Sequence, residues 1–295
     1  MKKIISLILA IAMIAALTIT FVSCNKETTG DDASTNKATN KIGVQAGTTG
    51  QYFVDGDADW GFDGINGFTS AHYNNGGLAV NDMKNGNVDF VIIDEQPAKQ
   101  LVKKIKGVKV IDIPLTVEEY AFGVDKAQDD LLASVNTILA EIKADGTLDA
   151  IITAYATGEG IKPFTSATFD ANRADEQLVV ATNAAFAPFE YKEGDQFAGI
   201  DMEIAAYIAN KLGLELVIMD MDFDAVVTSV GKNCVDIAMA GLTVNETRKE
   251  SVNFTESYYN AAQVIVVMEN ETAFDNCKTA EDVLAVLASK APKAE

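Results

Sequence analysis

Residues 43–50 read GVQAGTTG, an apolar strand candidate that ends in a turn of glycine and threonine. The strand candidate itself covers residues 41–45, and the turn Gly-Thr-Thr-Gly follows one residue later. Such a turn can direct backbone N–H groups and hydroxyl groups toward an anion. The same pattern also fits an ordinary connection between a strand and a helix, so it indicates a site only in combination with other residues.

Strand-like and helix-like segments alternate along the rest of the chain. This alternation predicts α/β layers with a largely parallel sheet. The first two expected helices, residues 130–143 and 199–212, are followed by glycines that can end them, and Asp201 is a candidate cap of the second. The third expected helix, residues 279–289, begins with the capping-box pattern Thr-x-x-Asp. Further strand candidates are residues 88–93, 108–113, 214–219, 235–240 and 263–268, and helix candidates are residues 130–143, 199–212 and 279–289.

Three more motifs lie in the C-terminal half: ATNAAFAPFEY at residues 181–191, MDFDAVVTSV at 221–230 and AGLTVNETR at 240–248. The last one ends in Arg248, whose planar guanidinium can hold a carboxylate through two charge-assisted hydrogen bonds. Each candidate has a simpler alternative when taken alone. Arg248 alone could form a surface ion pair. Asp94, which directly follows the strand candidate at residues 88–93, could alone be a helix cap.

Together these motifs resemble the polar amino-acid solute-binding proteins of ABC importers, bacterial extracellular solute-binding family 3. In that family the ATNAAFAPFEY and AGLTxTxxR types of motif come first and the GxxxGTTG type follows. Here the order is reversed, with residues 41–158 corresponding to the second half and residues 177–270 to the first. The resemblance therefore implies a circularly permuted, periplasmic-binding-protein-like fold: two α/β lobes joined by two hinge crossings.

The resemblance also implies how the chain is divided. A GTTG lobe covers residues 41–116 and an Arg lobe covers residues 117–267, with the permutation joint at 158–176. Residues 268–295 carry a C-terminal helix that returns to the GTTG lobe. We expect a self-contained monomer, because each family segment occurs once. The alternative is a rearranged fragment that needs a second chain to complete each lobe.

The N-terminal residues read as an export signal. A basic start, an apolar run and the sequence FVSC predict a lipoprotein signal peptide over residues 1–24, with Cys24 as the lipidated residue. A plain signal anchor is the alternative. Residues 25–40 lack large apolar side chains and read as a flexible tether. We therefore expect an extracytoplasmic lipoprotein that is anchored to the membrane.

The formal net charge of the chain is −20. Removing Lys2 and Lys3 with the signal peptide would make it −20 − 2 = −22. So acidic a chain argues against nucleic acid or an anionic membrane as its partner. Besides Cys24, the chain has Cys234 and Cys277, which fall in different expected lobes, so we expect no disulfide between them.

The resemblance implies a ligand, a free L-amino acid, and partners, the permease subunits of an ABC importer. It implies no cofactor and no metal. The carboxamides of Gln45 and Asn183 would favour a ligand with a neutral polar side chain, whereas the carboxylate of Glu190 would favour a ligand with a basic one. Arg248, Thr243, Thr48 and Thr49 would contact the carboxylate of the ligand, and Asp94 would contact its ammonium. Its side chain would contact Phe186, Phe223, Asn183, Gln45 and Glu190. Gly241 is a further candidate contact of the ligand.

Two other functions fit less well. Asp55, Asp57 and Asp59 match the first ligand positions of a calcium loop, but Gly61 and Asn66 do not fit its later positions, so a solvated acidic loop is expected. An enzyme of the same fold, such as a dehydratase, would need a general acid or base over the ligand. The single histidine, His72, lies far from every expected pocket segment.

Overall fold

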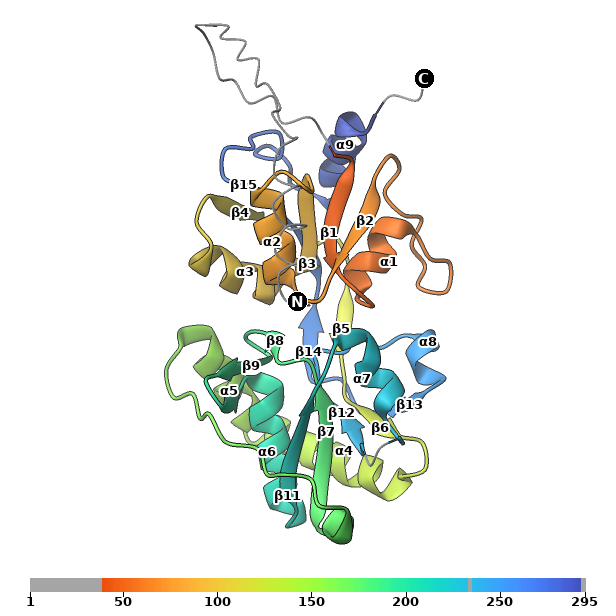
Figure 1. Ribbon diagram of the computed structural model, residues 1–295, viewed down its shortest axis with the longest axis vertical. Coiled ribbons are helices and arrows are strands. Elements are labelled where there is room, and N and C mark those ends of the chain that lie inside the picture. The colour runs from red at the N-terminus through yellow and green to blue at the C-terminus, as the bar shows by residue number, and fades with distance from the viewer. Residues whose placement is uncertain (1–38, 233–234, 293–295) are drawn as a thin grey trace, which may run out of the picture. The chain divides into compact units, whose positions relative to one another are not determined.

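The computed structural model describes residues 39–232 and 235–292. They belong to one compact unit that contains two five-stranded sheets, each covered by helices on both faces (Figure 1). The predicted fold class, two α/β lobes joined by two crossings, is confirmed. Residues 1–24 with Cys24, most of the tether, and Cys234 lie outside the described residues.

The GTTG lobe is built on a sheet whose central strands are buried on both faces. Helices α2 and α3 cover one face, and α1 and α9 cover the other. The strand order is β2 (Thr69–Tyr73), β1 (Lys41–Gln45), β3 (Phe90–Asp94), β15 (Gln263–Met268) and β4 (Val108–Ile111). The helices are α1 (Thr49–Asp55), α2 (Gly76–Lys84), α3 (Glu95–Lys104) and α9 (Ala280–Lys290).

The Arg lobe repeats this plan. Helices α4, α5 and α6 pack into one hydrophobic cluster on its sheet, and α7 packs into another. The strand order is β11 (Glu215–Asp220), β7 (Gln177–Thr182), β12 (Ile237–Ala238), β6 (Gly123–Asp125) and β13 (Val252–Phe254). The other elements are α4 (Asp129–Ala144), α5 (Thr147–Thr157), a 3-10 helix (Ala171–Glu176), β8 (Ala185–Phe186), β9 (Glu190–Glu193), β10 (Gln196–Ala198), α6 (Ile200–Leu212), α7 (Phe223–Ser229) and α8 (Glu246–Lys249).

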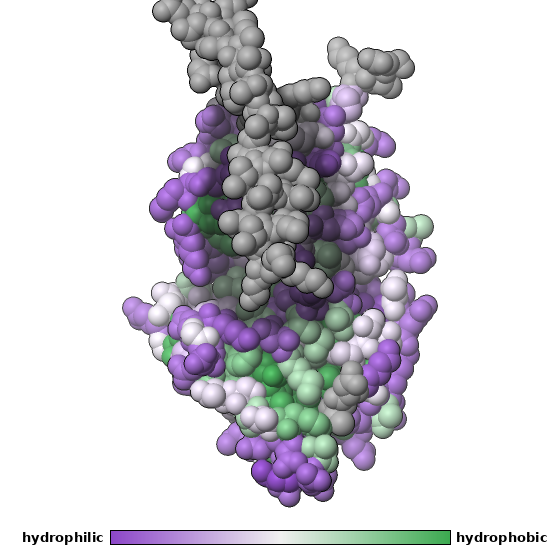
Figure 2. All heavy atoms as spheres, viewed as in Figure 1, coloured by the Kyte–Doolittle hydropathy of each residue, from purple (hydrophilic) through white to green (hydrophobic). Residues whose placement is uncertain are grey.

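A two-stranded sheet joins the lobes. Strands β5 (Glu118–Tyr120) and β14 (Tyr259–Ala261) run antiparallel, with Tyr120 opposite Tyr259. Each strand carries the chain from one large sheet into the other. Figure 2 shows hydrophilic residues along the rims of both lobes, and hydrophobic residues gathered in the middle of the Arg lobe.

The crossings explain two differences from the sequence-based expectations. Both large sheets are mixed rather than largely parallel, because β6 and β15 enter their sheets from the hinge side and run antiparallel to their neighbours. The predicted boundary after Val267 is also misplaced. Strand β15 pairs with β3 and β4, so Gln263–Met268 already belongs to the GTTG lobe.

The expected permutation joint packs along the Arg lobe. Phe164 and Phe197 exchange backbone hydrogen bonds at 2.9 and 2.8 Å, and the N–H of Ala167 donates to the carbonyl of Leu216 at 3.0 Å. The hydroxyl of Ser166 accepts a hydrogen bond from the N–H of Ile218. Residues 164–167 therefore lie beside β10 and β11.

Candidate functional site

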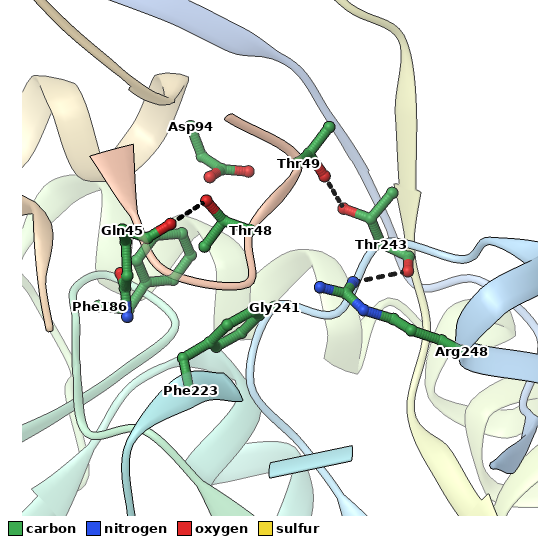
Figure 3. Close-up of a pocket in the computed structure, with 9 residues that line it drawn as sticks. All are labelled: Gln45, Thr48, Thr49, Asp94, Phe186, Phe223, Gly241, Thr243 and Arg248. Carbon is green, nitrogen blue, oxygen red and sulfur yellow. Dashed lines mark hydrogen bonds between the residues drawn. The ribbon is translucent and has the colours of Figure 1, made fainter. Parts of the chain in front are cut away.

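A pocket lies between the lobes, at the ends of strands and helices from both (Figure 3). Its cavity volume is about 10 Å³, which leaves room for about one water molecule between the lobes. Nine residues line it, and the sequence predicted all nine as ligand contacts. They are Gln45, Thr48, Thr49 and Asp94 from the GTTG lobe and Phe186, Phe223, Gly241, Thr243 and Arg248 from the Arg lobe.

Arg248 lies on α8 and is buried. Its backbone N–H donates to the side chain of Asn245, which caps the helix. Its Nη1 donates to the carbonyl of Thr243 at 2.8 Å, and its Nη2 donates across the cleft to the carbonyl of Gly47 at 3.1 Å. Burial lowers the pKa of the guanidinium to about 10, so it remains a cation near neutral pH.

Two aromatic rings lie against the guanidinium of Arg248. Its Cζ is 5.1 Å from the ring centroid of Trp60 and 5.4 Å from that of Phe223. Trp60 also stacks on Tyr52, with 4.4 Å between centroids. Sequence reasoning missed Trp60 and Tyr52 as neighbours of the site, although Tyr52 lies only two residues beyond the GTTG turn.

A chain of hydroxyl and carboxylate groups links the lobes beside the pocket. Thr49 Oγ1 donates to Thr243 Oγ1 at 3.1 Å, and Thr243 Oγ1 donates to Glu118 Oε2 at 2.6 Å. The other oxygen of Glu118 accepts from Thr116 Oγ1 and from Gln263 Nε2. The sequence did not single out Glu118, because nothing in the residues around this glutamate indicates that its side chain is buried.

Asp94 ends β3 and is buried at the pocket wall. The hydroxyl of Tyr120, on the hinge strand β5, donates to its carboxylate. Burial, followed by the negative charge of Glu118, raises the pKa of Asp94 to about 7. The carboxyl is therefore about half protonated at neutral pH, and a cation beside it would favour its ionised form.

Gly241 allows the ring of Phe186 from the Arg lobe and the ring of Tyr120 from the hinge to approach its backbone closely. Its φ is +54°, and a Cβ there would lie 3.0 Å from the ring of Phe186 and 3.2 Å from that of Tyr120. Its N–H donates to Asp201 Oδ2 at 2.9 Å. The expectation that Asp201 caps α6 is wrong: Gly199 precedes that helix, and the buried Asp201 carboxylate holds Gly241 instead.

The two carboxamides expected to contact the ligand contact each other. Gln45 Nε2 donates to Asn183 Oδ1 at 2.9 Å, and Asn183 Nδ2 donates to the carbonyl of Met221 at 2.7 Å. Gln45 lines the pocket and Asn183 does not. The bond joins β1 to the loop after β7, so it also links the two lobes.

Glu190 is fully buried on β9, opposite Phe186. Neither of its carboxylate oxygens has a hydrogen-bond partner in the described part of the chain, and the residue does not line the pocket. Burial, and then the charges of Asp201 and Asp94, raise its pKa well above the usual range. Burial therefore disfavours the charged form of Glu190.

The acidic loop after α1 uses its carboxylates internally. Asp57 Oδ1 accepts from the N–H groups of Asp59 and Trp60, and Asp55 Oδ2 accepts from Ser70 Oγ at 2.8 Å. Over residues 39–232 and 235–292, no group of three His, Cys, Asp or Glu side chains is placed to hold a metal ion. In the same ranges, no helix is long and apolar enough to cross a bilayer.

Part of the chain is similar to a known protein family. Residues 178–291 match the bacterial extracellular solute-binding proteins, family 3. The arginine-binding extracellular protein ArtP of Bacillus subtilis is 41% identical over 91 residues, which are 31% of this chain and 36% of ArtP. The arginine-binding protein ArgT of Corynebacterium glutamicum is 32% identical over 33% of each chain.

The alignments with these curated relatives span about a third of their length. Among solved structures, the arginine-bound domain 1 of TmArgBP is 29% identical over 41% of this chain and 99% of that chain, with a TM-score of 0.28. Residues 178–291 of this chain are therefore similar to the bacterial extracellular solute-binding proteins of family 3.

Proposed function

We propose that the pocket between the lobes binds a free L-amino acid. One observation carries this proposal: a buried guanidinium, that of Arg248, and a buried carboxylate, that of Asp94, line the same small pocket. The carboxylate and the ammonium of an amino acid complement these two charges.

A ligand in this position would contact both lobes and so favour their closed arrangement over an open one. The matched family consists of solute-binding proteins, so we assign the chain to binding rather than to catalysis. We propose that the protein delivers its ligand to the permease subunits of an ABC importer. We further propose that it acts outside the cytoplasm, held at the membrane by a lipid on Cys24.

Titration of the protein lacking residues 1–24 with the twenty amino acids tests the proposal. We expect saturable 1:1 binding of at least one amino acid by calorimetry. Its melting temperature should rise with ligand concentration, because a ligand that binds only the folded state stabilises it by RT ln(1 + [L]/Kd). Absence of binding by all twenty would refute the proposal.

The ligand's side chain has two candidate classes. The carboxamides of Gln45 and Asn183 favour a neutral polar side chain such as that of glutamine. A basic side chain is the second candidate. It is favoured by Glu190, a buried carboxyl group without a hydrogen-bond partner, and by relatives named arginine-binding and histidine-binding. A cation would restore the charged form of this acid, which its burial now disfavours.

A competition between arginine and glutamine separates these classes. If the ligand is basic, arginine binds more tightly, and Glu190→Gln removes that preference while glutamine affinity stays within a few-fold. If the ligand is neutral, glutamine binds more tightly and Glu190→Gln leaves the order unchanged. Asp195→Asn, in the exposed turn after β9, is a matched control for the loss of one negative charge.

We also infer that the chain order is a circular permutation of the family. The family match covers one continuous stretch, residues 178–291, which contains the Arg248 motif. The GTTG motif precedes that stretch, yet both motifs line one pocket. The packing of α9 in the same cluster as β1 supports this inference, because it brings the two ends of the permuted domain into one lobe.

A further inference from the structure

Trp60 contacts Arg248 from the opposite lobe. The indole belongs to the loop after α1 in the GTTG lobe, whereas Arg248 belongs to α8 in the Arg lobe. The distance of 5.1 Å from Cζ to the ring centroid is within the range of a cation–π contact. Phe223, from the Arg lobe itself, lies 5.4 Å away. The guanidinium therefore has one aromatic neighbour from each lobe.

The loop that carries Trp60 is firmly held. Asp57 and Phe62 exchange backbone hydrogen bonds at 2.8 and 2.9 Å, which closes a tight turn. The Asp57 carboxylate accepts from the N–H of Trp60, and the ring of Tyr52 stacks under the indole. Gly61, with a φ of +74°, completes the turn. These contacts place the indole before any ligand contact is made.

We propose that Trp60 is a positioning residue that orients the Arg248 guanidinium for the ligand's carboxylate only when the lobes are closed. The proposal rests on the binding function proposed above. The plane of the guanidinium determines where its N–H groups point. A bidentate contact forms only when this plane is aligned with the carboxylate of the ligand. The Arg lobe supplies Phe223 at all times, whereas closure adds Trp60 and the carbonyl of Gly47.

This role predicts a characteristic pattern of affinities. All amino acids share the carboxylate, so loss of the indole should weaken every bound amino acid by the same factor. We expect a loss of about tenfold in Kd, which corresponds to about 1.4 kcal/mol and lies in the range of a cation–π contact. The effect should appear mainly in the dissociation rate, because the contact exists only in the closed state. It should not change which amino acid binds best.

The test compares Trp60→Leu and Trp60→Phe with the parent, using the tightest-binding amino acid, a weaker one, and the α-carboxamide of the first. We expect Trp60→Leu to weaken both amino acids about tenfold and the carboxamide little, and Trp60→Phe to retain most of the affinity. Phe62→Leu is the matched control, because Phe62 lies in the same loop and packs edge-on against Phe53. It should leave all three affinities near those of the parent.

Three outcomes would overturn the proposal: unchanged affinity in Trp60→Leu, different losses for the two amino acids, or an equal loss for the carboxamide. A separate measurement does not depend on ligand. Trp60 is the only tryptophan of the chain, so Arg248→Met should alter the tryptophan emission of the ligand-free protein. An unchanged emission spectrum would refute the contact, whether or not any amino acid binds.

Discussion

Arg248 is a buried cation whose hydrogen bonds go to backbone carbonyls rather than to a carboxylate. Burial of a charge is costly unless it is compensated. Glu118 and Asp94 are the nearby negative charges, and they raise the pKa that burial lowers. Arg248 is thus held in place by the protein without being neutralised through a direct ion pair. This arrangement leaves it suited to an anionic ligand group.

Arg248→Ala should weaken amino-acid binding by about 2–5 kcal/mol, because the ligand's buried carboxylate would lose its charged partner. Calorimetry on the variant measures this loss. Arg173→Ala is the control: Arg173 is about half exposed and pairs with Glu176, so its removal should leave binding unchanged. A variant at position 248 that binds as tightly as the parent would exclude Arg248 from the site.

The pKa of Asp94, about 7 in the ligand-free protein, predicts a pH-dependent affinity. A ligand ammonium pairs with the ionised carboxylate, so below pH 7 binding must first displace a proton. Affinity should therefore fall as pH is lowered from 7 to 5, by at most about tenfold per pH unit. Calorimetry across this range checks the slope.

The variant Asp94→Asn tests the assignment of that slope. It should bind more weakly at pH 8 and lose most of the pH dependence. The stability of the ligand-free protein should show the opposite trend. Because the folded-state pKa of Asp94 is raised, its contribution to stability is lost as pH rises from about 4 to about 7. An affinity that is constant between pH 5 and 8 would contradict this role for Asp94.

Among the elements, α9 shows most clearly how local sequence and tertiary packing cooperate. Thr279 and Asp282 form the predicted capping box, in which each side chain bonds to the other's backbone N–H. The buried side of the helix, with Val283 and Leu287, packs in the cluster that contains Ile42 and Val44 of β1. The C-terminal helix therefore covers one face of the sheet that contains β1, the first strand of the described residues.

Leu287→Ala should destabilise the protein by about 2–5 kcal/mol, because it leaves a cavity in this cluster. Urea unfolding followed by Trp60 fluorescence reports on the same lobe. Ser289→Ala, at an exposed position of the same helix, is the control and should have little effect. Removal of residues 279–295 should weaken ligand binding as well. Wild-type stability in Leu287→Ala would mean that α9 does not contribute to the lobe's core.

At the scale of the whole molecule, both lobes are built from separated parts of one chain. Strand β15 returns from the hinge to complete the first sheet, and β6 enters the second sheet after the other crossing. Hydrogen bonds such as Thr49 to Thr243 and Gln45 to Asn183 connect the lobes across the pocket.

Because segments from both ends of the described chain pack into the same lobe, we propose that the protein is a monomer. Sedimentation of the protein without residues 1–24 should give the mass of one chain at micromolar concentration, with and without ligand. Glu281→Ala, on the exposed side of α9, should not change this result. A dimer that exchanges α9 between two chains would contradict the expectation and favour the rearranged-fragment alternative.

The sequence by itself predicted six of the strands, three of the helices and the capping box, and the family resemblance of its motifs predicted all nine residues that line the pocket. These features depend on local patterns: apolar periodicity, capping residues and short motifs. The direction of β6 and β15, the burial of Glu118, the partner of Asp201 and the contact of Trp60 with Arg248 depend on residues far apart in the chain. Only the tertiary structure decided them, because burial and pairing partners are set by how the lobes pack and not by neighbours in sequence.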